Sequence, residues 1–191
     1  TPLCRATAAL LLLGLATPAA AGCDHPGALG TARVMEVAIP AGGLFVGTKS
    51  YRETLALEPK EVVLTFDDGP AGATTDRVLA ALEAECVRAT FFVVGQMAAA
   101  RPEQLRRIAA SGHTVGHHSM THVIMNTVPH ERGRADIETG WRTVDRILDG
   151  RVGERPATPF FRSPGFAPTK ALSSWLADGR VGVFGADFWG S

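Results

Sequence analysis

Two adjacent carboxylates, Asp67 and Asp68, are the first residues of this sequence whose type and position suggest chemistry. They end an apolar run, Val62–Phe66, and are followed at once by Gly69 and Pro70, which continue a strand poorly. The pattern predicts a buried strand that carries both aspartates to a tight loop at its carboxyl end, where parallel α/β folds build their active sites. Two neighbouring negative charges repel each other, so the pair needs a cation or a proton.

A histidine cluster further along the chain supplies a partner for the aspartates. His118 and His122 are four residues apart, a spacing at which a helical turn or a tight loop aims both imidazoles at one point. Two neutral imidazoles and one carboxylate form a three-ligand set of the kind that holds catalytic zinc and leaves one position open. Such a metal polarises a carbonyl and lowers the pKa of water, while the second aspartate is free to take a proton.

Each motif also has a simpler interpretation. Asp-Asp-Gly-Pro is a good turn sequence, because aspartate bonds its own backbone and glycine permits positive φ. Two histidines four residues apart also occur as exposed neighbours on a helix. The two motifs together, each after a strand-like run, favour a metal site. His117 adjoins His118 but would face the other side of a strand, which favours a structural role for it.

A lone arginine follows a third short apolar run. Arg162 comes directly after Thr158–Phe161, so it too would lie at the end of a strand. Its guanidinium could hold Asp67 there by a bidentate contact and keep that carboxylate ionised. On local sequence alone, a solvated loop arginine is the slightly favoured interpretation.

Taken in order, these motifs resemble those of the polysaccharide deacetylases with NodB homology, which include the chitooligosaccharide deacetylases. The resemblance extends from Glu61 to the end of the chain. Three runs carry it: Asp67-Asp68-Gly69-Pro70, His118-Ser119-Met120-Thr121-His122 and Phe161-Arg162-Ser163-Pro164-Gly165-Phe166.

The resemblance implies a role for each matching residue. Asp67 is expected to be the general base, and Arg162 to position it. One divalent metal ion, expected to be zinc, would be held by Asp68, His118 and His122. Contacts with the substrate are expected at two further residues, Thr121 and Pro164.

Strand-like runs alternate with helical patterns along the chain, which predicts a parallel α/β fold. The resemblance sharpens this to a distorted (β/α) barrel of the polysaccharide deacetylase type, incomplete at the C-terminus because fewer strands are visible than the family uses. Residues 61–191 would form this domain, and residues 23–60 a leader with a short strand or hairpin. Strands are expected at Val62–Phe66, Ala89–Val94, His113–His117, Thr158–Phe161 and Arg180–Phe184, and helices at Thr74–Glu85, Pro102–Ser111, Glu131–Asp149 and Thr169–Asp178.

Two family features are missing or poorly matched near the C-terminus. The family places its general-acid histidine in a later Leu-x-His motif, and no histidine follows Arg162. Its Asp-Trp motif matches Asp187-Phe188-Trp189 poorly. We therefore expect a C-terminally truncated part of a longer enzyme, whose general acid lies past Ser191. The truncated chain itself is expected to be inactive.

The N-terminal residues 1–22 resemble a secretory signal peptide. Arg5 precedes an apolar run, Ala8–Ala16, that is too short for a stable membrane span, and a stretch of small residues follows. The alternative interpretation of these residues is an uncleaved N-terminal anchor. The protein is therefore expected to be exported, periplasmic or extracellular. Lipoprotein anchoring through Cys23 is a second interpretation, because Ala20–Cys23 resembles a lipoprotein processing site.

Two cysteines remain once the signal has been removed. Cys23 and Cys86 are expected to form a disulfide in an oxidising compartment. Cys86 as a small core residue is the alternative.

Composition narrows the partners. The sequence has 19 basic and 19 acidic residues and no basic stripe, so neither a nucleic acid nor another polyanion is expected to bind. A hydrophobic share of 46% is enough for a globular core, and we expect one monomeric domain after the signal.

These observations favour one function over two alternatives. The preferred function is metal-dependent hydrolysis of N-acetyl groups from an oligo- or polysaccharide that contains N-acetylglucosamine, such as chitooligosaccharide or peptidoglycan. The first alternative is a hydrolase of another small amide or of an O-acetyl ester, because the same chemistry serves both. The second is a non-catalytic glycan-binding protein that keeps the metal site.

Overall fold

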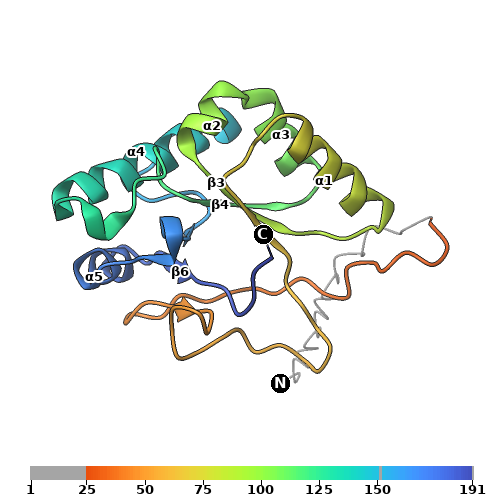
Figure 1. Ribbon diagram of the computed structural model, residues 1–191, viewed down its shortest axis with the longest axis horizontal. Helices are drawn as coiled ribbons and strands as arrows, with labels where there is room; N and C mark the ends of the chain where they lie inside the picture. Colours follow the sequence, from red (N-terminus) through yellow and green to blue (C-terminus); the bar gives the residue numbers. More distant parts are fainter. Residues whose placement is uncertain (1–24, 151, 191) are drawn as a thin grey trace, which may run out of the picture.

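The computed structural model describes residues 25–150 and 152–190 (Figure 1). The predicted signal peptide and Cys23, the residue of the alternative lipoprotein interpretation, lie outside these residues. Cys86 is disulfide-bonded, and its pairing with Cys23 stays a prediction because Cys23 is not described. Within the described part of the chain, none of the helices is both long and apolar enough to cross a membrane.

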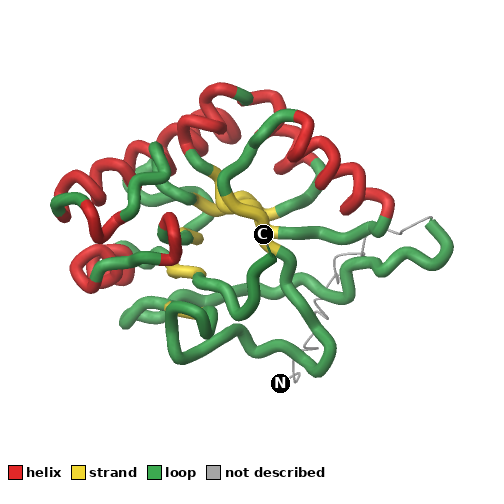
Figure 2. The backbone as a smooth tube through the Cα atoms, viewed as in Figure 1, coloured by secondary structure: helices red, strands yellow, loops and turns green. Residues whose placement is uncertain are grey.

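The described residues form one parallel sheet that curls into an open half-barrel (Figures 1 and 2). Its spatial order is β1-β6-β5-β4-β3-β2, so β1 and β2 are the two edges. The predicted parallel α/β fold and incomplete barrel are confirmed. The strands are β1 (Phe45–Val46), β2 (Thr65–Asp67), β3 (Thr90–Val93), β4 (Thr114–His117), β5 (Phe160–Phe161) and β6 (Gly182–Phe184).

The helices lie on the outer side of this curled sheet (Figure 2). Predicted helix ends are close to the observed ones because the local signals are present: Pro102 begins one helix, and Gly150, in the left-handed conformation, ends another. The helices are α1 (Ala73–Ala84), α2 (Gly95–Ala100), α3 (Pro102–Ala110), α4 (His130–Asp149) and α5 (Lys170–Asp178), with 3-10 turns η1 (Met125–Thr127) and η2 (Pro164–Phe166).

Alternation along the strands separates the core from the inner face. Phe91, Val93 and Val115 face the helices and form one apolar cluster with Leu105 and Ile108. The neighbouring residues on each strand therefore face the inside of the half-barrel. A second cluster fills the space between α4, α5 and strands β5 and β6, with Met125, Ile137, Trp141, Phe161, Leu172, Leu176, Val181 and Val183 as its buried members.

The structure corrects two of the predicted elements. Strand β2 begins only at Thr65, and the preceding residues Val62, Val63 and Leu64 are 78%, 45% and 42% exposed, because β2 is an edge strand. Helix α2 is absent from the prediction, since it is short and starts with a glycine. The leader contributes the short strand β1, one of the two forms expected of it, and this strand pairs with the distant β6.

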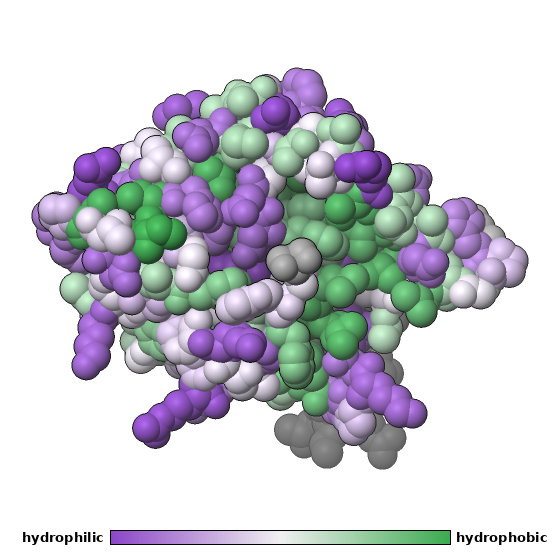
Figure 3. All heavy atoms as spheres, viewed as in Figure 1, coloured by the Kyte–Doolittle hydropathy of each residue, from purple (hydrophilic) through white to green (hydrophobic). Residues whose placement is uncertain are grey.

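Apolar side chains are exposed beside the chain's C-terminal end. They gather there on the face shown in Figure 3. The exposed large apolar residues include Val62 and Phe188, the second of which is 91% exposed. A patch of this kind is unusual on the surface of a folded domain.

Candidate functional site

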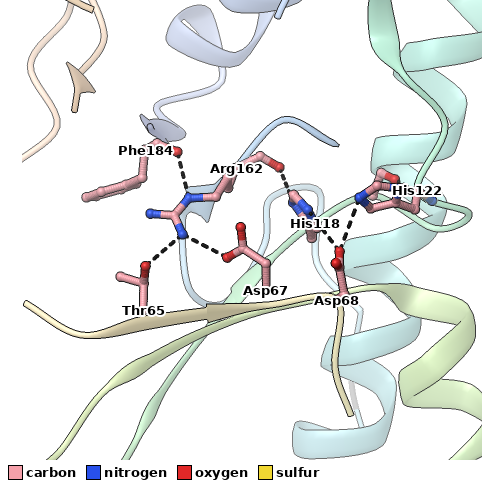
Figure 4. Close-up of polar contacts among 8 residues, drawn as sticks. Thr65, Asp67, Asp68, His118, His122, Arg162 and Phe184 are labelled. Atoms are coloured by element: carbon pink, nitrogen blue, oxygen red, sulfur yellow. Dashed lines mark hydrogen bonds and ion pairs between the residues drawn. The ribbon is translucent and has the colours of Figure 1, made fainter. Parts of the chain in front are cut away.

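Asp67 and Arg162 form an ion pair across the inside of the half-barrel (Figure 4). Asp67 is the last residue of β2, and Arg162 directly follows β5. Arg162 Nη1 lies 2.7 Å from Asp67 Oδ1, and the two side chains are only 5% and 24% exposed. The contact expected between them is present, although it uses one N–H group rather than a bidentate fork. The guanidinium therefore places a positive charge against this carboxylate and fixes the orientation of Oδ1.

Four hydrogen bonds fix the guanidinium of Arg162. Beside its bond to Asp67, Nη1 donates to Thr65 Oγ1 at 2.7 Å. Nε donates to the carbonyl of Phe184 at 3.1 Å, and Nη2 to that of Gly185 at 2.6 Å. The cation therefore has one position, which is set by the ends of β2 and β6.

An aromatic ring supports the guanidinium from the sheet. The Arg162 Cζ atom lies 4.2 Å from the ring centroid of Phe92, an inward-facing residue of β3. On β4, the residue paired with Phe92 is Gly116, where a Cβ atom would lie only 2.8 Å from that ring. The absence of a side chain at Gly116 thus gives the ring its space.

Asp68, His118 and His122 form the expected three-residue cluster (Figure 4). Asp68 Oδ1 lies 3.1 Å from His122 Nε2 and 3.4 Å from His118 Nε2. The three potential ligand atoms all lie within 4.8 Å of one another. Asp68 has a φ of 67°, so the backbone leaves the strand there, and its carboxylate does not follow that of Asp67 toward Arg162.

The orientation of His118 suits metal binding. Its Nδ1 lies 2.7 Å from the carbonyl oxygen of Arg162. A carbonyl oxygen can only accept, so Nδ1 carries the hydrogen and the lone pair of the neutral ring is on Nε2, toward Asp68. When the imidazoles are protonated instead, His118 foremost and then His122 hold the pKa of Asp68 below its ordinary value.

This donor set fits a divalent metal ion. A carboxylate oxygen and two imidazole nitrogens at this spacing need a shared cation, either a metal ion or protons. One carboxylate and two imidazoles are the ligands of a zinc site with an open position. The exposure of Asp68 (69%) and His122 (37%) leaves such a position accessible.

The two residues expected to bind substrate lie close to the cluster in sequence. Thr121, between the two histidines, is exposed, and its hydroxyl donates to Asp136 of α4 at 2.7 Å. Pro164, two residues after Arg162, is buried at the start of η2. A substrate contact for either residue stays a prediction.

The neighbouring His117 lies on the other face of β4, as expected. It is 2% exposed, and its Nε2 lies 4.0 Å from Asp145 Oδ1 of α4. Burial lowers the pKa of His117 to about 4. The residue is therefore a neutral core histidine near neutral pH.

Sequence reasoning missed several residues that build the site. Thr65 could have been found, because alternation puts it on the same face as Asp67. Asp187 was named only as part of a poor match to a family motif, and its contacts were not predicted. It follows β6 and accepts hydrogen bonds from the Thr48 amide at 2.8 Å and the Thr54 hydroxyl at 2.6 Å, which fastens the leader to the sheet. Nothing local marks Asp136, because its partners are distant in sequence.

Comparison with known proteins agrees with this geometry. Residues 55–175 match the sequence model of the polysaccharide deacetylase family. The chain belongs to the polysaccharide deacetylase family. The match includes all five residues at the centre of the site: Asp67, Asp68, His118, His122 and Arg162.

Individual members of the family show how far the likeness extends. A chitooligosaccharide deacetylase of Sinorhizobium fredii is 47% identical over 98 residues, which cover 51% of this chain and 41% of that protein. A peptidoglycan-N-acetylglucosamine deacetylase of Bacillus cereus is 36% identical over 104 residues, which cover 54% of this chain and 36% of that protein. The structure of a Bdellovibrio bacteriovorus peptidoglycan deacetylase superposes with a TM-score of 0.63 at 30% identity, covering 86% of this chain and 46% of that one. The chain thus spans less than half the length of each of these proteins.

Proposed function

We propose that this chain carries the metal site and the general base of a hydrolase that removes N-acetyl groups from glycans containing N-acetylglucosamine. One observation supports this above the others: Asp67 and Asp68 are adjacent, yet they face different positive partners. Arg162 faces Asp67, and the two imidazoles that would share an ion face Asp68. One carboxylate is thereby available for proton transfer while its neighbour binds metal.

The residues of the chain divide the reaction between them. Asp68, His118 and His122 would hold the ion, which when bound polarises the acetamide carbonyl and acidifies water. Asp67 takes a proton from the attacking water, and Oδ2 is the oxygen that accepts it because Arg162 donates to Oδ1. Arg162 holds that carboxylate in place through its hydrogen bond to Oδ1. The carbon–nitrogen bond then breaks to give acetate and an amine, which needs a proton from a general acid.

The proposed substrate follows from what the relatives share. Their names specify chitooligosaccharide and the N-acetylglucosamine of peptidoglycan, so N-acetylglucosamine is the common unit. We further propose zinc as the metal, an exported monomeric protein with no nucleic-acid partner, and the division into residues 1–22, 23–60 and 61–191.

A non-catalytic glycan-binding protein is the second candidate. The family resemblance implies a histidine in a Leu-x-His motif as general acid, and the absence of that motif from the complete gene would favour this candidate. Such a protein would keep the metal and bind the same glycan without releasing acetate.

Acetate release separates these candidates. The protein expressed from its complete reading frame, loaded with zinc, is incubated with chitooligosaccharide, and acetate and free amine are measured. Equal amounts of both products, lost after chelation of the metal, are the expected result. Glycan binding without acetate would favour the second candidate. Acetate from an O-acetylated glycan alone, with no amine formed, would favour ester hydrolysis.

A further inference from the structure

The loop that carries His122 is hydrogen-bonded to helix α4 through one residue, Asp136, mainly by its carboxylate. We propose that Asp136 is a positioning residue, which holds Thr121 and His122 in the conformation that metal binding requires. The inference rests on the proposed metal site and adds a residue to it. Asp136 touches none of the three ligand side chains in the described contacts, so it would act through the loop backbone.

The contacts of Asp136 use both of its carboxylate oxygens. Oδ2 accepts hydrogen bonds from the backbone amides of Met120 at 2.9 Å and Thr121 at 3.1 Å. The Met120 amide is shared with the backbone carbonyl of Asp136 at 3.1 Å, so the contacts of Thr121 are the ones that depend on the side chain alone. Oδ1 accepts from the Thr121 hydroxyl at 2.7 Å. Hydrogen bonds to an ionised carboxylate are stronger than those between neutral groups. Three of them on two consecutive residues fix the loop just before His122.

The loop needs such support because its backbone is strained. Ser119 and His122 have φ angles of 66° and 59°, in the left-handed region that side chains other than glycine rarely adopt. Strained residues persist at functional sites only where surrounding contacts fix them. One contact, from the His122 amide to Ser119 Oγ at 3.0 Å, lies within the loop itself. It cannot fasten the loop to the rest of the protein.

The first half of the loop has other supports. Helices α2 and α4 lie side by side (Figure 1), and Ser119 and Met120 pass between Gly95 of one and Gly140 of the other. A Cβ at Gly140 would lie 2.6 Å from the Ser119 carbonyl carbon. The amides of Gly95 and Gln96 donate to the Ser119 and Met120 carbonyls, both at 2.9 Å.

The second half of the loop depends on Asp136. Among the described contacts, the hydrogen bonds that tie Thr121 to another element all go to Asp136. His118 is different, because it is buried after β4 and bonded to the Arg162 carbonyl. Loss of the Asp136 carboxylate should therefore release His122 and leave His118 in place.

Zinc affinity tests the inference without reference to turnover. The zinc dissociation constant is measured by competition with a chromogenic chelator for Asp136→Ala. Loss of a residue that orients a ligand weakens metal binding by about 10- to 100-fold, and we expect this range. Glu138→Gln is the matched control: it removes a carboxylate from the same helix that pairs with Arg134 and Arg142, and it should leave affinity unchanged.

A double-mutant cycle separates positioning of His122 from a general loss of structure. In a His122→Ala background, removal of Asp136 should weaken zinc binding little further, because the ligand that it orients is gone. An equal loss in both backgrounds would overturn the inference, as would wild-type affinity in Asp136→Ala. If that variant does not fold, as judged by circular dichroism, Asp136→Asn is measured in both backgrounds with the same criteria. Failure of the proposed function shows differently, as zinc-loaded wild-type protein that releases no acetate.

Discussion

The two adjacent aspartates lie in two contrasting regions of one site. Asp67 faces the buried side chain of Arg162, which is 5% exposed and donates to four hydrogen-bond acceptors. Asp68 belongs to an open triad with His118 and His122, in which the side chains of Asp68 and His122 are 69% and 37% exposed. The first region carries its own cation, and the second presents only groups that would share one.

This contrast shows how a single backbone step divides two identical side chains between two tasks. Asp67 is still in β2, whereas Asp68 has already left it with a positive φ. Under the proposed function, the buried region fixes the position of the base, and the open region leaves space for an ion and a substrate.

The largest effect is expected from Asp67→Asn. Loss of a general base lowers turnover by about 100- to 10,000-fold, while zinc content should stay near that of the wild type because Asp67 is not a ligand. Acetate release and elemental analysis on the complete gene product measure the two quantities. The adjacent Asp68→Asn is the matched variant, which should lose zinc as well as activity. A near-normal rate in Asp67→Asn would show that the two roles are reversed.

Loss of a metal ligand comes next. His118→Ala removes the buried member of the triad, and zinc affinity should fall by more than about 100-fold, beyond the effect of losing a residue that only orients a ligand. Chelator competition measures it, with His130→Ala as a control histidine outside the triad. Stoichiometric zinc retained in His118→Ala at low micromolar protein would contradict the assignment.

The opposite face of β4 should control acid stability. In the folded protein burial lowers the pKa of His117 to about 4 from 6.5, so between these values the unfolded chain binds the proton more readily. Stability is therefore fully present above pH 6.5 and is lost as the pH falls toward 4, by up to about 3 kcal/mol.

His117→Asn should flatten this dependence when urea unfolding of the metal-free protein is followed across that window. A residual dependence of stability on pH is expected from His113, because burial lowers the pKa of that residue as well. An unchanged slope would show that the buried imidazole is not the group responsible.

The smallest effect is expected from Thr65→Val. It removes one acceptor of Arg162 but leaves the contact of the same nitrogen with Asp67. Unfolding free energy should fall by about 1 kcal/mol, the usual contribution of one hydrogen bond, and turnover should change little. A rate loss as large as that of Asp67→Asn would mean that Thr65 has a part in the chemistry.

Much of the fold could be predicted because its signals are local. Helix α4 was expected at Glu131–Asp149 and is found at His130–Asp149, since its apolar residues recur at helical spacing and Gly150 ends it. The apolar run Val62–Leu64 was misjudged for the opposite reason. Hydrophobicity indicates what a segment can bury, but burial depends on a neighbour, and β2 has a neighbour on one side only.

The residues of the candidate site also differ in how far the sequence predicts them. The types and spacing of the aspartates and histidines indicated the cluster, because those residues lie at strand ends that the topology brings together. Asp136 and Asp187 carried no comparable signal. Asp136 lies in α4 and bonds the loop that follows β4, and Asp187 bonds the leader, which lies more than a hundred residues earlier in the chain. Such pairings exist only once the chain is folded.

Arg162 joins both regions through two different parts of itself. Its side chain holds Asp67, and its backbone carbonyl holds the ring of His118. A substitution at this position removes the first bond, whereas any residue there still has a carbonyl group for the second. During divergence, a descendant could therefore exchange this arginine, lose the group that positions the proposed base and keep an acceptor for the ring of His118. A protein of this fold could thus lose the proposed activity by one substitution and still bind the metal ion and a glycan.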